Sequence, residues 1–188
     1  MPPKVRITKE EIIKTAVEVV RCDGAETLNA RVIAKELGCS TQPVFSNFAS
    51  MEDLKHAVVD AADDLYQQYI KREIELGKYP EYKASGMAYI RFAKEERELF
   101  KLLFMRDRSD ETVPNETGEL QEIYGIAQTS TGIDEEKIKL FHLEMWAYVH
   151  GIAAMTATNY LQLDTDLVSE MLTDAYQGLK NRYKTEEA

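Results

Sequence analysis

The stretch that most constrains the fold is residues 29–48, which read as two short helices joined by a tight turn. Gly38 lies where the first helix must stop, and glycine is favoured just past a helix end because it adopts a left-handed backbone without strain. Pro43 falls in the first turn of the second helix, where a missing N–H does no harm, and Ser40 or Thr41 can cap that helix. This spacing predicts a helix-turn-helix.

The second of these helices has an apolar side and a polar side. Val44 and Phe48 lie four residues apart and are expected to point inward. The outward side chains are short hydrogen-bonding groups, which a helix in the DNA major groove needs in order to read base edges. An ordinary helical corner with a polar surface is the alternative interpretation. The expected outward residues are Thr41, Gln42, Ser46 and Asn47.

Composition predicts an all-α chain. The 188 residues include only 9 glycines and 5 prolines, too few to break the chain often, and no stretch alternates as strands do. The N-terminus lacks an apolar signal core, and no run approaches the roughly 20 apolar residues of a membrane span. We therefore expect a cytoplasmic protein without a membrane partner. Cys22 and Cys39 are too isolated to indicate a disulfide framework or a zinc site.

The charge distribution separates the first 50 residues from the rest. The chain carries a net charge of −10, which argues against nucleic-acid binding because phosphate neutralisation supplies much of the affinity. Residues 1–50, however, hold seven basic and six acidic residues, so their balance is +1 and that of the other 138 residues is −11. The acidity therefore belongs to the remainder of the molecule, and the candidate DNA-reading segment is near neutral.

Helix signals on either side of the helix-turn-helix predict two domains. Thr8 and Glu11 have the spacing of a capping box and begin a helix that ends at Gly24, which completes a three-helix unit. Ser50 caps a helix that runs to about Gly77, long enough to leave the first unit and enter a second. The predicted domains are residues 1–50, a helix-turn-helix DNA-binding domain, and residues 51–188, a helical ligand-binding and dimerisation bundle.

The first half of the second predicted domain contains shorter elements. A helix is expected to begin near Pro80 and to carry an apolar stripe at residues 87–93, and a run of large apolar residues follows at 99–105. Residues 106–118 are polar and rich in helix breakers, and are predicted to form a mobile loop. A short helix is expected around residues 119–128.

The same domain ends in two long amphipathic helices. One reads with few breaks from about Asp134 to Leu161, and Asp164 caps the other. Small residues on the first let backbones approach, and the apolar stripe of the second is too broad to bury against one neighbour. We therefore predict a homodimer held by four helices across a twofold axis. The predicted dimer residues are Ala147, Gly151, Ala154, Val168, Met171, Leu172, Ala175 and Tyr176.

Large, soft apolar side chains permit a cavity for a small, largely apolar molecule in this domain. A filled core is the alternative interpretation. His150 follows Trp146 by one turn, where a histidine is more often a hydrogen-bonded core residue than a ligand or base, and its spacing from His142 is wrong for a metal pair. We predict no metal and no cofactor. The candidate ligand-binding residues are Phe92, Phe100, Phe104, Met105, Tyr124, His142, Met145, Trp146 and His150.

Residues 6–54 also carry a characteristic series of small and apolar residues: Ile12, Ala16, Gly24, Ile33, Ala34, Gly38, Ser40, Val44, Phe45, Phe48 and Leu54. In these positions the chain resembles the DNA-binding region of the tetracycline-repressor (TetR) family of transcriptional regulators. The resemblance implies a homodimeric regulator, usually a repressor, that leaves its double-stranded operator DNA when a small-molecule effector binds the C-terminal domain. Trp146, His150 and Gly151 resemble the Trp-x-x-x-His-Gly signature of one subgroup.

The resemblance assigns roles unevenly to the reading segment. Arg31 falls where the family often touches phosphate, whereas Phe45 stands in place of a usual tyrosine whose hydroxyl meets a phosphate. Asn47 replaces a frequent histidine, and Met51 replaces the usual lysine at the start of the fourth helix. These losses affect affinity more than base reading, because phosphate contacts position and base contacts specify. The predicted DNA-binding residues are Arg31, Ser40, Thr41, Gln42, Pro43, Phe45, Ser46 and Asn47.

Two groups of residues complete this prediction. Gln42 is the best candidate for base readout, since an amide can bond an adenine edge in two places. Lys4, Arg6 and Lys9 can compensate for the lost phosphate contacts from the N-terminal arm.

Other function classes receive less support from the sequence. It contains no Gly-rich phosphate loop, no nucleophile elbow and no HExxH motif, so we expect no enzymatic activity. A helical interaction protein without sequence-specific DNA binding is the alternative, and the overall acidity and the two lost phosphate contacts favour it.

Overall fold

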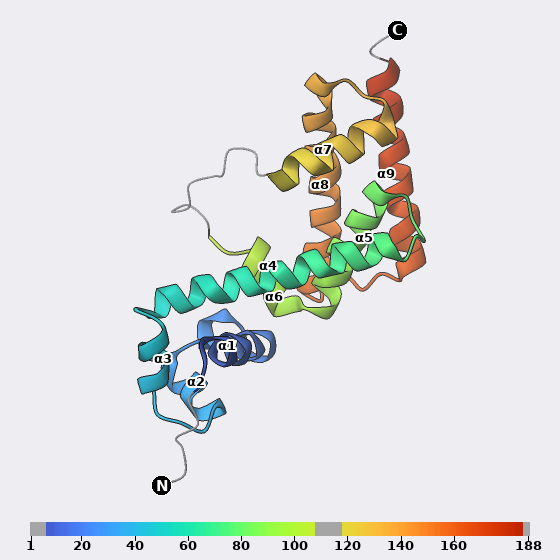
Figure 1. The fold of residues 1–188 in the computed structure, drawn as a ribbon. Coiled ribbons are helices and arrows are strands. Elements are labelled where there is room, and N and C mark those ends of the chain that lie inside the picture. Colours follow the sequence, from blue (N-terminus) through green and yellow to red (C-terminus); the bar gives the residue numbers. More distant parts are fainter. Residues whose placement is uncertain (1–6, 108–117, 186–188) are drawn as a thin grey trace. The chain divides into compact units, whose positions relative to one another are not determined.

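The computed structural model describes residues 7–107 and 118–185. All regular elements within these ranges are helices (Figure 1), so the predicted all-α class is confirmed. The α-helices are α1 (Lys9–Asp23), α2 (Ala30–Glu36), α3 (Gln42–Asn47), α4 (Met51–Glu75), α5 (Glu81–Glu95), α6 (Arg97–Phe104), α7 (Gly118–Thr131), α8 (Glu135–Ala157) and α9 (Thr165–Thr185), and a 3-10 turn, η1 (Ala25–Thr27), follows α1.

The described chain forms two compact units, and they do not divide it at residue 50. The first unit contains the residues up to Gln67 together with Glu96–Arg106. The second contains Gln68–Glu95 and the residues from Asp107 onward. Helix α4 therefore starts in the first unit and ends in the second, and the chain returns to the first unit for α6.

Local capping signals in the first unit agree with the sequence. The Thr8 side chain accepts a hydrogen bond from the Glu11 N–H while the Glu11 carboxylate accepts one from the Thr8 N–H, which is the predicted capping box. The Ser50 hydroxyl accepts from the Asp53 N–H at the start of α4. Each of these bonds satisfies a donor that a helix start leaves unpaired, and such a cap contributes about 1 kcal/mol.

Helix α6 packs against α1 within the first unit. Leu99 and Phe100 on α6 are fully buried, as are Ile12 and Ala16 on α1. Glu96 breaks the helical path before α6 with φ −121° and ψ 52°, and its carboxylate accepts a hydrogen bond from Arg21 Nε of α1 at 2.7 Å. The apolar run at 99–105 thus supplies core to the first unit rather than to the second.

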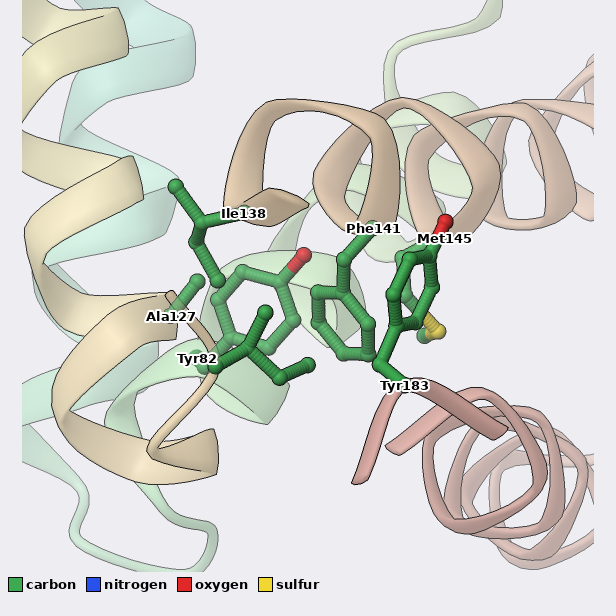
Figure 2. Packing of buried hydrophobic residues seen from close by; sticks show 7 residues of the cluster. Tyr82, Ala127, Ile138, Phe141, Met145 and Tyr183 are labelled. Atoms are coloured by element: carbon green, nitrogen blue, oxygen red, sulfur yellow. The ribbon is translucent and has the colours of Figure 1, made fainter. Parts of the chain in front are cut away.

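The core of the second unit is built mainly by α5, α7, α8 and α9 (Figure 2). Helix α5 packs along α8, and a Cβ on Gly86 of α5 would lie 3.4 Å from both Val149 and Leu172, so glycine permits the close approach of three helices. Polar side chains tie the bundle at its edge, where the Tyr183 hydroxyl donates to Glu144 at 2.9 Å. The buried cluster contains Tyr82, Ala127, Ile133, Ile138, Phe141, Met145 and Tyr183.

Several boundaries differ slightly from the prediction. The long penultimate helix ends at Ala157 instead of Leu161, and Asn159 at φ 57° follows it. The Asp164 carboxylate caps α9 by accepting from the Leu167 N–H, as predicted. The predicted loop at 106–118 lies largely outside the described residues, as do Lys4 and Arg6 of the N-terminal arm.

The described ranges contain neither a candidate membrane span nor a candidate metal cluster. No helix there is long and apolar enough to cross a membrane. No group of three metal-ligating side chains gathers in the same ranges.

Candidate nucleic-acid interface and effector site

The turn between α2 and α3 has the backbone that the sequence predicted. Gly38 adopts φ +63°, a left-handed conformation that costs a residue with a Cβ roughly 1–2 kcal/mol. Helix α2 begins at a cap that the sequence prediction missed, because the Asn29 side chain accepts from the N–H groups of Arg31 and Val32, each at 3.1 Å. Thr41 is the N-cap residue of α3, one of the two predicted positions, but its side chain makes no capping hydrogen bond.

Helix α3 has one buried face and one exposed face. Val44 and Phe48 are buried, which confirms their inward orientation. Gln42, Phe45 and Ser46 are exposed and lie on the opposite side, because residues three and four apart share one face of a helix. The predicted reading residues therefore form a continuous surface on one short helix.

Two polar groups of α3 are already engaged within the helix. The Ser46 hydroxyl donates to the Gln42 carbonyl at 2.8 Å, and the Asn47 amide donates to the Pro43 carbonyl at 2.8 Å. The Gln42 side-chain amide has no hydrogen-bond partner in the described part of the chain. It is therefore the one side-chain amide of α3 with its full capacity to pair with a base edge.

A cationic side chain of α1 contacts the helix-turn-helix. Lys9 of α1 lies with its Nζ 5.1 Å from the centre of the Phe48 ring. Arg31 is exposed on α2, and Ser40 is exposed in the turn. Met51, half-buried at the first position of α4, supplies no charge. Lys9 is thus the described residue of the predicted compensating set that reaches the helix-turn-helix core.

The candidate effector residues do not form one set. Phe100, Phe104 and Met105 belong to the first compact unit, and the other six belong to the second. Phe92 and Phe100 are fully buried, and Met145 is part of the packed cluster in Figure 2. These three serve as core, as the filled-core interpretation has it.

Two tyrosine–histidine pairs link α5 to α8 in the second unit. The Tyr82 hydroxyl lies 3.0 Å from His142 Nδ1, and the Tyr89 hydroxyl lies 2.8 Å from His150 Nδ1. Burial lowers the pKa of both histidines. Neutral imidazoles can accept at Nδ1 from the tyrosines, so both histidines are hydrogen-bonded as the sequence predicted for His150.

A half-buried aromatic group surrounds His142. The Tyr124 ring meets the His142 ring edge to face, with the two ring centroids 5.3 Å apart. The centroid of the Tyr82 ring lies 6.0 Å from that of His142. Tyr82 itself is buried, whereas Tyr124 and His142 are half-buried. Tyr124 and His142 are candidate effector residues of the second unit that touch one another and are both half-buried.

Trp146 lies on the surface of α8 instead of lining an interior. Its indole is 43% exposed and stacks on the His150 ring with centroids 4.9 Å apart. Ala147 and Gly151 are exposed on the same helix, and a Cβ on Gly151 would meet nothing within 4 Å. The exposed large apolar residues of α8 and α9 are Leu140, Leu143, Trp146, Tyr148 and Leu167.

The burial of α9 corrects part of the predicted dimer surface. Val168 and Leu172 are buried in the core of their own protomer, and Ala175 and Tyr176 pack against the buried cluster. Met171 on α9 and Ala154 on α8 are half-buried and retain surface. A stripe of α9 that looked too broad for one neighbour is therefore largely covered within the protomer.

One signal in the sequence could have revealed the tyrosine–histidine pairs. Tyr82 and Tyr89 are seven residues apart, and His142 and His150 are eight apart, so each pair of residues spans about two helical turns. Matching intervals on two helices predict two matching contacts once the helices are known to pack side by side. The sequence alone did not show that α5 packs on α8.

Comparison with known proteins gives one family match. Residues 82–176, about half of the chain, match the family described as tetracyclin repressor-like, C-terminal domain. No curated protein matches the sequence significantly.

Solved structures share the fold at low identity. A Rhodococcus sp. RHA1 protein of unknown function is 20% identical with a TM-score of 0.70, over 97% of this chain and 99% of its own. A TetR-like transcriptional regulator from the same organism is 16% identical with a TM-score of 0.66, over 95% and 98% of the two chains. The multidrug binding protein EbrR, complexed with imidazole, is 17% identical with a TM-score of 0.56, over 88% of both.

Proposed function

Because this chain belongs to the tetracyclin repressor-like family, we propose that it is a homodimeric transcriptional repressor that leaves its operator when a small molecule binds the second unit. The observation that carries the DNA-binding part is the exposed face of α3, the helix that follows the turn at Gly38. On this face the Gln42 amide has no hydrogen-bond partner among the described residues and lies beside Phe45. A helix presented in this way can enter a major groove with its outward side chains at the base edges.

The dimer proposal rests on the exposed apolar side chains of α8 and the start of α9. Leu140, Leu143 and Ala147 recur at helical spacing on one face of α8, and all three are exposed. Leu167 of α9 is also exposed. Covering such a face in an isologous contact removes apolar surface from water on both copies. The proposed interface residues are therefore Leu140, Leu143, Trp146, Ala147, Gly151, Ala154, Leu167 and Met171.

The effector proposal rests on the group formed by Tyr82, Tyr124 and His142. Its rings supply an apolar, aromatic surface, and the His142 ring keeps one nitrogen beyond the bond to Tyr82. A few polar groups in aromatic surroundings are the usual composition of a small-molecule site. EbrR, a fold relative, was solved with imidazole, which supports small-molecule binding on this fold.

Selection from a random DNA library by the purified full chain tests the DNA-binding proposal. We expect a two-fold symmetric sequence with its half-sites a whole number of helical turns apart, about 34–36 Å or a multiple. Gln42→Ala should lower discrimination at one base pair of each half-site by about 5- to 150-fold, since a bidentate pair discriminates by roughly 1–3 kcal/mol. Enrichment of no sequence would favour the helical interaction protein.

A displacement assay then tests the effector proposal. Labelled operator bound to the protein is titrated with a library of small aromatic and cationic compounds, and release is followed by fluorescence anisotropy. A true effector loses potency with His142→Leu and Tyr124→Leu, while operator affinity without compound stays unchanged. Trp146 fluorescence is a poor substitute reporter, because the indole lies on the exposed face of α8.

A further inference from the structure

We propose that the phenyl ring of Phe45 reads a thymine through contact with its 5-methyl group, within one or two base pairs of the adenine bound by Gln42. The inference rests on the proposed DNA-binding function and adds to it a base and a residue. Phe45 lacks the hydroxyl with which a tyrosine would meet a phosphate, so a base contact is the role left to its ring.

The position of the ring is the first step of the argument. Phe45 is 55% exposed and, among the described residues, has no ring or hydrogen-bonded partner. It lies three residues after Gln42 and one before Ser46, on the exposed face of α3. The ring therefore belongs to the surface that meets the base edges, and not to the side that packs on α1 and α2.

The second step concerns the polar groups beside the ring. The Ser46 hydroxyl donates its only proton to the Gln42 carbonyl, and the Asn47 amide donates one of its protons to the Pro43 carbonyl. The exposed face of α3 therefore presents the amide of Gln42 and the ring of Phe45, neither of which has a partner among the described residues. It also presents the Ser46 hydroxyl, which can still accept a hydrogen bond but has no further proton to donate. Little besides Gln42 and Phe45 can carry strong base selectivity on this helix.

The chemistry of the major groove then selects the base. Thymine presents a methyl group there beside its O4 acceptor, whereas guanine, adenine and cytosine present hydrogen-bonding atoms and no methyl group. A phenyl ring placed against those atoms would remove them from water without a partner, which is unfavourable. Against the thymine methyl it removes apolar surface from water, which is favourable. The ring therefore both attracts thymine and rejects the other bases.

Helix geometry fixes the distance between the two readings. Side chains three residues apart on a helix have Cβ atoms about 5–6 Å apart. Successive bases along one strand rise by about 3.4 Å. Gln42 and Phe45 therefore meet base pairs that are adjacent or one step further apart. Each half-site should contain two A·T pairs at this spacing, each in either orientation.

A methyl scan of the selected operator tests the inference. Each thymine is replaced singly by deoxyuridine, which removes the methyl group and leaves every hydrogen bond, and affinity is measured by fluorescence anisotropy. We expect one thymine per half-site at which the loss of the methyl weakens binding about fourfold, the value for one buried methyl group. The other thymines should tolerate the change.

Matched variants assign the effect to the ring. Phe45→Ala should bind the thymine and uracil operators equally, whereas Gln42→Ala should keep the fourfold ratio between them. Phe45→Tyr should also keep the ratio, because its ring is unchanged. Circular dichroism confirms that each variant is folded, and the uracil scan of the unaltered protein needs no variant.

Three outcomes overturn the inference, and one of them also overturns the proposed DNA-binding function. A specific operator that shows no thymine sensitive to its methyl, or a ratio that survives in Phe45→Ala, overturns this inference and leaves the DNA-binding function intact. Failure to select any sequence overturns the proposed function and this inference with it.

Discussion

The hydroxyl of Tyr82 lies 3.0 Å from Nδ1 of His142, so a buried tyrosine on α5 meets a half-buried histidine on α8. Burial raises the pKa of Tyr82 and lowers the pKa of His142. Both shifts favour the neutral forms, in which the tyrosine donates and the imidazole nitrogen accepts. The bond between the two helices therefore depends on pH through the histidine.

This dependence predicts how stability changes with pH. The folded pKa of His142 lies below the unfolded value of about 6.5, so between these values the unfolded chain binds more protons. The contribution of neutral His142 to the free energy of unfolding is thus fully present above about pH 6.5, and it is lost as the pH falls toward the folded pKa. His142→Gln should flatten the change in urea midpoint between about pH 8 and about pH 6, measured at one protein concentration.

The other histidines supply the comparison for that measurement. His150, whose pKa burial also lowers, should keep part of the slope in the His142→Gln variant. His56 is an exposed histidine on α4, with 72% of its side chain accessible, and His56→Gln supplies the comparison for loss of a surface histidine. A slope unaltered by His142→Gln would contradict the prediction.

The dimer can be tested with two leucines of similar exposure. Leu143 on the proposed α8 interface is 56% exposed, and Leu76 after α4 is 59% exposed. Leu143→Glu should split the dimer at micromolar concentration, because a carboxylate desolvated without a partner costs several kcal/mol. Leu76→Glu should leave it intact. Sedimentation velocity distinguishes the two, and a monomeric unaltered protein would disprove the interface.

The turn before α3 can be tested by adding a single methyl group. A Cβ on Gly38 would meet nothing within 4 Å, so Gly38→Ala should cost only the strain of φ +63°, about 1–2 kcal/mol. Gly125 inside α7 is equally open but has no positive φ, so Gly125→Ala should stabilise by about 0.5–1 kcal/mol. Urea denaturation of both variants should therefore give changes of opposite sign.

The missing phosphate contacts can be restored at one position. Met51→Lys at the start of α4 should strengthen binding to every DNA sequence and steepen the salt dependence by about one unit. Met105→Lys adds the same charge to an exposed methionine at the end of α6, away from the helix-turn-helix sequence. It should change the salt slope less. Equal slopes in the two variants would show that position 51 does not meet a phosphate.

Local signals predicted the helices well because they depend on near neighbours along the chain. The capping box at Thr8, the positive φ of Gly38 and the cap at Asp164 each involve residues within four positions of one another. Such interactions depend only on the residue types within a short stretch of sequence. The element type followed from them for nearly the whole described chain.

The prediction was weaker wherever a helix is apolar on more than one side. Val168 and Leu172 carry the same apolar character as Leu143, yet the first two face their own protomer and Leu143 faces outward. The sequence cannot distinguish these faces, since hydrophobicity favours burial without naming the partner. The same ambiguity assigned Phe100 to an effector cavity when it fills the core beside α1.

The position of α6 has a consequence for synthesis of the chain. Helix α1 buries Ile12 and Ala16 in a unit that also requires Leu99 and Phe100, which are translated more than 80 residues later. Chains emerge from the ribosome N-terminus first at about 5–20 residues per second. Several seconds therefore pass between the synthesis of α1 and the synthesis of α6, which packs against it. A nascent chain stalled before residue 97 would expose that face, and the interval offers chaperones a defined site to occupy.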